Sequence, residues 1–196
     1  MGKKVLLSLA FVVVALTAFA QTESEHLKFK GVPIDGTLRE YVSKMESAGF
    51  SYLGEDDGTA LLEGEFAGVK GCTVGVSVLK STNVVNTIVV IFPELDNWAS
   101  LERMYLQFKS MLAEKYGKPS DCVEEFQSSY GIPLTDNDKF HKLMFDQCVY
   151  YTIFETSKGN IQLSLAHQGV STAFLRLQYW DRINTDAARA EAMDDL

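Results

Sequence analysis

Two blocks of the chain alternate apolar and polar residues at period two, and this alternation constrains the fold more than any other feature. In the first block Cys72, Val74 and Val76 alternate with small or polar residues, and in the second Ile161 and Leu163 do the same. A strand with this period buries one face and leaves the other in water. Such strands are typical of antiparallel sheets, so we expect an α+β protein.

Eight strands are expected from this pattern and from the turn residues between them. They cover residues 50–53, 59–66, 72–79, 84–92, 121–126, 149–155, 161–167 and 173–180. The run at 84–92 is apolar enough to predict a central strand that is covered on both faces.

Two helices are expected between these strands. Thr37 and Glu40 form a capping-box pattern at the start of the first helix, and Gly49 ends it. The second helix begins at Asp96 or Asn97 and carries an apolar stripe at three- and four-residue spacing. A short alanine-rich helix is expected over residues 185–195.

The order of these elements predicts a duplication. Residues 21–93 form one helix with four antiparallel strands, residues 94–181 form a second, and both pack as one domain. The second copy carries an insertion at 128–146, in which we expect a further strand over residues 139–145. Residues 182–196 close the chain.

The N-terminus has the pattern of a secretory signal peptide over residues 1–20. Two lysines precede an apolar run at 5–18, and the Ala-Phe-Ala triplet that ends at Ala20 suits signal peptidase. A membrane anchor needs about 20 apolar residues, so we expect cleavage between Ala20 and Gln21. The mature protein would then be periplasmic or extracellular, with no membrane span.

The charge of the chain excludes one class of partner. With 18 basic and 26 acidic residues the net charge is −8, and no basic cluster offsets it. Such a surface repels phosphate backbones, so nucleic acid is not an expected partner.

Three cysteines leave more than one thiol arrangement open. In an oxidising compartment Cys72, Cys122 and Cys148 could form one disulfide and one free thiol, or remain three buried thiols. Cys122 and Cys148 would lie near opposite ends of two paired strands. This disfavours a bond between those two, and of the remaining pairs we favour Cys72–Cys148.

The sequence offers no catalytic or metal-binding motif. His26 falls in the segment after the cleavage site, where we expect it to be mobile, and His141 and His167 are interpreted as residues at the rim of apolar faces. No histidine or cysteine spacing supports zinc, and the acidic stretch at 55–57 is interpreted as a solvated turn. We expect no cofactor.

A binding surface is predicted on the last strand. Alternate residues of this strand point to opposite faces of the sheet. One set is apolar and is expected to face the core: Ala173, Leu175, Leu177 and Tyr179. The other set faces the wetter side. That set is Phe174, Arg176, Gln178 and Trp180. Aromatic residues and arginine on the wetter face of a sheet have the composition of a binding hot spot.

The predicted layout resembles the tandem helix-plus-four-strand architecture of the β-lactamase inhibitor proteins. The phrases KFKGVPIDGTL, EKYGKPS and SLAHQGV also resemble those of small uncharacterised exported bacterial proteins. Neither resemblance implies an active site.

We therefore expect an exported, non-catalytic module that binds an extracytoplasmic protein or peptide. Two alternatives stay open. One is a hydrolytic enzyme whose Asp, Glu and His residues converge from separate strands, and the other is an envelope-assembly or regulatory subunit.

Overall fold

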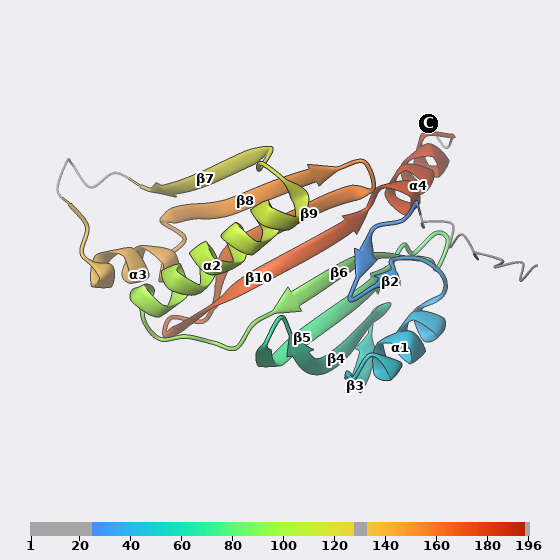
Figure 1. Ribbon diagram of the computed structural model, residues 1–196, viewed down its shortest axis with the longest axis horizontal. Coiled ribbons are helices and arrows are strands. Elements are labelled where there is room, and N and C mark those ends of the chain that lie inside the picture. Colours follow the sequence, from blue (N-terminus) through green and yellow to red (C-terminus); the bar gives the residue numbers. More distant parts are fainter. Residues whose placement is uncertain (1–24, 128–132, 195–196) are drawn as a thin grey trace, which may run out of the picture.

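A computed structural model describes residues 25–127 and 133–194. Most of this part of the chain forms an eight-stranded sheet in which every pairing is antiparallel, with helices on one face (Figure 1). A short hairpin of β1 (Lys28–Phe29) and β2 (Val32–Pro33) lies on the same side as the helices. The predicted α+β class and antiparallel sheet are confirmed.

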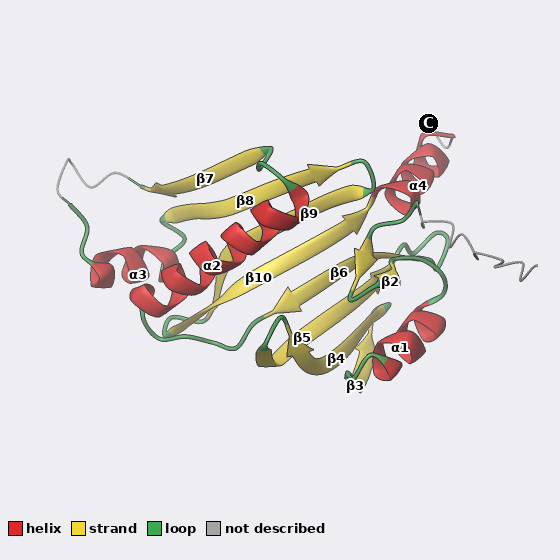
Figure 2. Cartoon of the chain, in the orientation of Figure 1, coloured by secondary structure: helices red, strands yellow, loops and turns green. Residues whose placement is uncertain are grey.

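All eight predicted strands are present. They are β3 (Ser51–Asp56), β4 (Thr59–Phe66), β5 (Val69–Val78), β6 (Val85–Ile91), β7 (Asp121–Phe126), β8 (Cys148–Thr156), β9 (Gly159–Gln168) and β10 (Thr172–Asp181). Their order across the sheet is β3-β4-β5-β6-β10-β9-β8-β7, so β6 and β10 are neighbours in the middle (Figure 2). At this seam Leu177 lies opposite Val90 and Gln178 opposite Val89.

Helix α1 (Leu38–Ser47) begins at the predicted capping box. The Thr37 hydroxyl accepts the Glu40 backbone N–H, and the Glu40 carboxylate accepts the Thr37 N–H. These two bonds satisfy backbone donors that the helix itself leaves unpaired. The helix buries Tyr41 and Met45 against the sheet.

Helix α2 (Trp98–Tyr116) covers the half of the sheet formed by β8, β9 and β10. Its first turn is capped by Asn97, whose side chain accepts the Ser100 N–H, and it ends at Gly117. The Tyr105 hydroxyl lies 2.5 Å from the Thr152 hydroxyl, so two buried polar groups satisfy each other at this contact.

The hairpin extends the core across the middle of the sheet. The ring of Phe29 stacks on that of Phe66, with centroids 5.2 Å apart, and meets Tyr179 edge-on at 5.5 Å. Phe29 is buried because the hairpin lies against the helix-covered face of the sheet.

The strand predicted at 139–145 is wrong. This segment belongs to α3 (Asp136–Met144), which begins at a second capping box formed by Thr135 and Asp138. His141 therefore does not share the strand parity assumed for it. Its ring is exposed and stacks on Phe145 at 4.4 Å.

Two other expectations also need correction. The run at 84–92 is central, but its second face is not covered, because Val89 and Ile91 are only half-buried. The last helix, α4 (Arg182–Asp194), begins earlier than predicted and follows β10 without a loop.

Candidate functional site

The four residues predicted on the wetter side of β10 lie together on one face of the sheet. Phe174, Arg176, Gln178 and Trp180 are each half-buried and alternate with buried residues of the same strand. We call this side of the sheet, opposite α1 and α2, the open face, because none of the described helices lies across it. Helix α4 reaches only its end, where Trp180 and Thr185 line a small cavity of 120 Å³.

Neighbouring strands extend this surface with apolar and polar residues. Residues opposite each other on paired strands point to the same side of a sheet. Arg176 lies opposite Ile91 of β6 on one side and Ser164 of β9 on the other. Gln178 lies in the same way between Val89 and a glutamine of β9. Arg176 and Gln178 thus each have a half-buried aliphatic neighbour on β6, whereas Trp180 lies between Thr87 and Asn160.

Arg176 is held in place but not neutralised. Its Nε donates to the Ser164 hydroxyl over 3.3 Å, and Ser164 is buried. Among the described residues Arg176 forms no ion pair. An arginine that is oriented by one bond keeps its remaining donors for a partner.

Two carboxylates on the β7–β8 side of the open face are already engaged. The Tyr151 hydroxyl donates to Asp121 over 2.8 Å, and Arg182 lies 3.3 Å from Glu155. Arg176, at the centre of this surface, pairs with no carboxylate among the described residues.

His141, His167 and Cys72, three candidate residues for a hydrolytic centre, lie on different elements and do not come together. His167, at the end of β9, contacts the Gly169 carbonyl at 2.8 Å and the Asp146 carboxylate at 3.1 Å. His141 lies on α3, and Cys72 is fully buried on β5. Within residues 25–127 and 133–194 no three His, Cys, Asp or Glu side chains are grouped to hold a metal ion.

The predicted Cys72–Cys148 disulfide is wrong. All three cysteines are free thiols. Cys72 on β5 and Cys148 on β8 are separated by four strand spacings, roughly 19 Å, whereas a disulfide joins Cα atoms within about 7 Å. Cys122 lies opposite Thr152 and Cys148 opposite Phe126, so these two cysteines also lie at different ends of their strands.

Cys122 instead belongs to a polar cluster that the sequence did not indicate. The Lys109 ammonium of α2 lies 3.1 Å from its sulfur and 2.5 Å from Glu124 Oε1. Partial burial acts to raise the pKa of Glu124, but the hydrogen bond and charge of Lys109 outweigh it and lower that pKa. The cluster joins α2 to β7, an edge strand.

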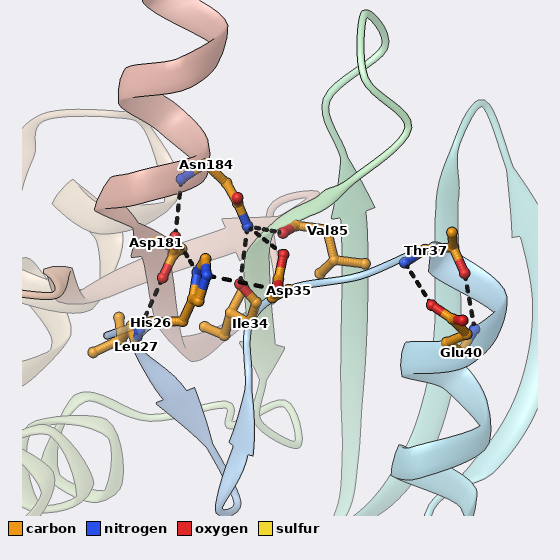
Figure 3. A network of polar contacts seen from close by, with 9 residues as sticks. All are labelled: His26, Leu27, Ile34, Asp35, Thr37, Glu40, Val85, Asp181 and Asn184. Atoms are coloured by element: carbon orange, nitrogen blue, oxygen red, sulfur yellow. Dashed lines mark hydrogen bonds and ion pairs between the residues drawn. The ribbon is translucent and has the colours of Figure 1, made fainter. Parts of the chain in front are cut away.

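A second network, also missed, joins the two ends of the described chain (Figure 3). The buried Asp181 carboxylate accepts the backbone N–H groups of Leu27 and Asn184, at 2.8 and 3.0 Å, and contacts His26. The Asn184 amide donates to the carbonyls of Ile34 and Val85. His26 is therefore fixed to the end of β10, and the expectation that it is mobile is wrong.

The acidic stretch at 55–57 forms the expected turn only in part, because Glu55 and Asp56 belong to β3 and Asp57 alone lies in the turn to β4. Asp57 is paired with Lys80 at 2.9 Å. Both side chains are exposed, so this pair contributes little to stability.

No family model, curated protein or solved structure matches the chain. None of the helices within the described residues combines the length and the apolar character that a membrane crossing requires. The open face is therefore defined as a candidate site by its own geometry.

Proposed function

We propose that the protein is an exported, non-catalytic binding module whose open face binds another protein. The observation that supports this most strongly is Arg176, which lacks a carboxylate partner at the centre of a half-buried surface containing Phe174 and Trp180. Arginine and aromatic residues are enriched where protein interfaces derive most of their binding energy.

The shape of the open face favours a protein over a small molecule. Small ligands are held in concave sites that bury most of their surface. The open face is instead a sheet surface that crosses β6, β10 and β9, with Val89 and Ile91 left only half-buried. A surface of this kind suits a partner that covers several strands at once.

The partner is expected to place a carboxylate over Arg176. In the free protein the guanidinium shares a single bond with a neutral hydroxyl. A carboxylate can accept two parallel bonds from it, and this geometry gives an interface its register.

The binding module is proposed to consist of two tandem helix-plus-four-strand units. The strand order reads outward from the seam as β6-β5-β4-β3 on one side and β10-β9-β8-β7 on the other, with a helix preceding each set in the chain. This order supports the duplication and the resemblance to the architecture of the β-lactamase inhibitor proteins.

Export is proposed from the signal-peptide pattern at residues 1–20, which lie outside the described part of the chain. Mass spectrometry of the protein isolated from its own cells tests it. An N-terminus at Gln21 is expected, and an intact leader on the soluble protein would contradict export.

The binding proposal is tested by quantitative capture from envelope extract. Wild type, Arg176→Glu and Trp180→Ala are compared with Leu106→Glu, which alters an exposed residue of α2 on the opposite side of the sheet. We expect one protein to be retained by wild type and Leu106→Glu, and to fall about tenfold or more with the two open-face variants.

Folding is checked by urea unfolding of each variant. Gln178→Arg, which alters a polar position in the same row, replaces any variant that unfolds. The proposal would be contradicted if the folded open-face variants retained as much of the captured protein as the Leu106→Glu control. It would also be contradicted if every open-face variant failed to fold.

A further inference from the structure

A groove on the helix-covered side of the sheet is lined by residues of α2, the β1–β2 hairpin and β10. It encloses 360 Å³, and Leu177 and Tyr179 of β10 form its floor. Phe108, Met111 and Leu112 of α2 line one wall. A volume of this size with a largely apolar lining is typical of small-molecule sites.

Lysines surround this groove. Lys28 and Lys30 line it from the hairpin, Lys115 lines it from α2, and no acidic residue lines it. A second cavity of 370 Å³ also has Lys28 and Lys115 in its lining and extends toward Lys158. This cationic rim is notable in a chain whose net charge is −8.

The rim lysines are not neutralised by the protein. Lys28, Lys30 and Lys115 form no ion pair within the described residues. Lys30 Nζ lies 3.4 Å from the Glu65 carbonyl oxygen, and Lys115 Nζ lies 5.0 Å from the Tyr116 ring centroid. Their charges therefore remain to attract an anion.

An independent feature of the groove is the phenol of Tyr179. Tyr179 is 4% exposed and lines the cavity, and its hydroxyl forms no hydrogen bond to the described residues. Burial raises the pKa of Tyr179, so the hydroxyl keeps its proton at neutral pH and can donate. The buried side-chain atoms without a partner within the described residues are the Tyr41 hydroxyl and Trp98 Nε1, so the Tyr179 hydroxyl is reached by solvent.

We propose that this groove binds a single-chain anionic amphiphile, a linear carboxylate with an apolar tail. The tail lies against Phe108, Met111 and Leu177, where its burial provides the hydrophobic driving force. The carboxylate meets the lysines at the rim, and Tyr179 can donate to an oxygen of the ligand. Neither the open face nor its proposed partner takes part in this site.

The ligand chemistry is tested by calorimetry on the protein carrying the N-terminus that the cell leaves on it. Three probes separate tail from charge: decanoate, decyltrimethylammonium with the same tail and opposite charge, and butyrate with the same headgroup and a short tail. Decanoate is expected to bind one to one, and the other two at least about tenfold more weakly.

The location of the site is tested with matched variants of α2. Met111→Glu places a negative charge in the groove wall, whereas Leu106→Glu makes the same change outside it. The two side chains are 43% and 49% exposed, so both variants are expected to fold. Decanoate affinity is expected to fall about tenfold or more in Met111→Glu alone.

The roles of the rim and the phenol are tested separately. The triple change Lys28→Gln, Lys30→Gln and Lys115→Gln is expected to abolish the preference for decanoate over decyltrimethylammonium. The matched control is the triple change Lys70→Gln, Lys118→Gln and Lys142→Gln, at positions outside both cavities. This control is expected to keep the preference for decanoate. Tyr179→Phe keeps the ring and is expected to weaken decanoate binding about fivefold.

Three results would overturn the proposal. The first is equal affinity for all three probes, and the second is unchanged decanoate binding in folded Met111→Glu. The third is binding to phosphatidylglycerol vesicles without binding of monomeric decanoate, which would indicate a membrane-surface contact instead.

Discussion

The Nδ1 atom of His26 lies 3.0 Å from Oδ1 of Asp181, although the two residues are 155 positions apart. The other oxygen of Asp181 accepts the backbone N–H of Leu27 over 2.8 Å. The carboxylate is fully buried, so this contact fastens the segment that leads into β1 to the junction of β10 and α4.

Asp181→Ala is expected to destabilise the protein by about 3 kcal/mol, because buried donors bonded to a charged group would lose their acceptor. The free energy of unfolding in urea measures the effect. Asp186→Ala, at an exposed position of α4, is the matched control and is expected to change little. Equal effects of the two changes would show that the network does not stabilise the fold.

Thr135→Ala is expected to lower the free energy of unfolding by about 1 kcal/mol, since it removes the cap of α3. The Thr135 hydroxyl accepts the Asp138 N–H over 3.3 Å in this capping box. Thr135→Ser keeps the hydroxyl and is expected to restore most of the loss. If serine proved no better than alanine, the cap would not be the cause.

Both capping boxes are expected to weaken in acid. The Thr37 backbone N–H lowers the pKa of Glu40, and the Thr135 hydroxyl lowers that of Asp138. The ordinary pKa values of these two carboxyl groups are 4.5 and 3.8. A carboxylate whose pKa is lowered by folding stabilises the protein at pH values above its ordinary pKa. That stability is lost as the pH falls through the folded pKa. The free energy of unfolding of Glu40→Gln should therefore be lower than that of wild type at neutral pH, and the two values should converge in acid. A constant difference would contradict this.

His167 is expected to show the opposite dependence. The Gly169 carbonyl and then the Asp146 carboxylate raise its pKa above 6.5. A raised folded pKa gives stability that is fully present below the unfolded value and is lost as pH rises through the folded value. His167→Gln should therefore cost more stability at about pH 5.5 than at about pH 8.5. NMR titration of the imidazole measures the pKa directly, and a value at or below 6.5 would be inconsistent with this geometry.

The three thiols are expected to react in a fixed order. Burial raises the pKa of Cys72, and it raises that of Cys148 to about 11, whereas Cys122 is exposed beside the Lys109 ammonium. Only the thiolate is nucleophilic, so iodoacetamide should modify Cys122 first. Peptide mass spectrometry identifies the labelled site, and Cys122→Ser should remove the fast phase. Earlier labelling of Cys72 in the folded protein would contradict the structure.

The strands were predictable because each is encoded by its own residues. Cys72, Val74 and Val76 alternate with polar neighbours, and the same local parity placed Arg176 and Trp180 on the wetter face. Helix α3 was missed because its residues were assigned to an insertion, although Thr135 followed three residues later by Asp138 is a capping-box signal.

The remaining features depend on contacts between distant parts of the chain. Whether Val89 is covered depends on where the helices pack, and no local pattern fixes that. Two partners of Asp181, His26 and Leu27, lie near the other end of the chain. Lys109 of α2 meets Cys122 of β7 only because α2 packs on the adjoining strand β8. The groove likewise exists only where the hairpin meets α2.

Site-specific photo-crosslinking tests the binding role of the open face most directly. A benzophenone amino acid is placed at Gln178, in the middle of the open face, or at Leu106 on α2, and cells producing each protein are irradiated. Binding through the open face predicts a discrete crosslinked protein from position 178 and none from position 106. No product from 178, or the same product from both positions, would contradict it.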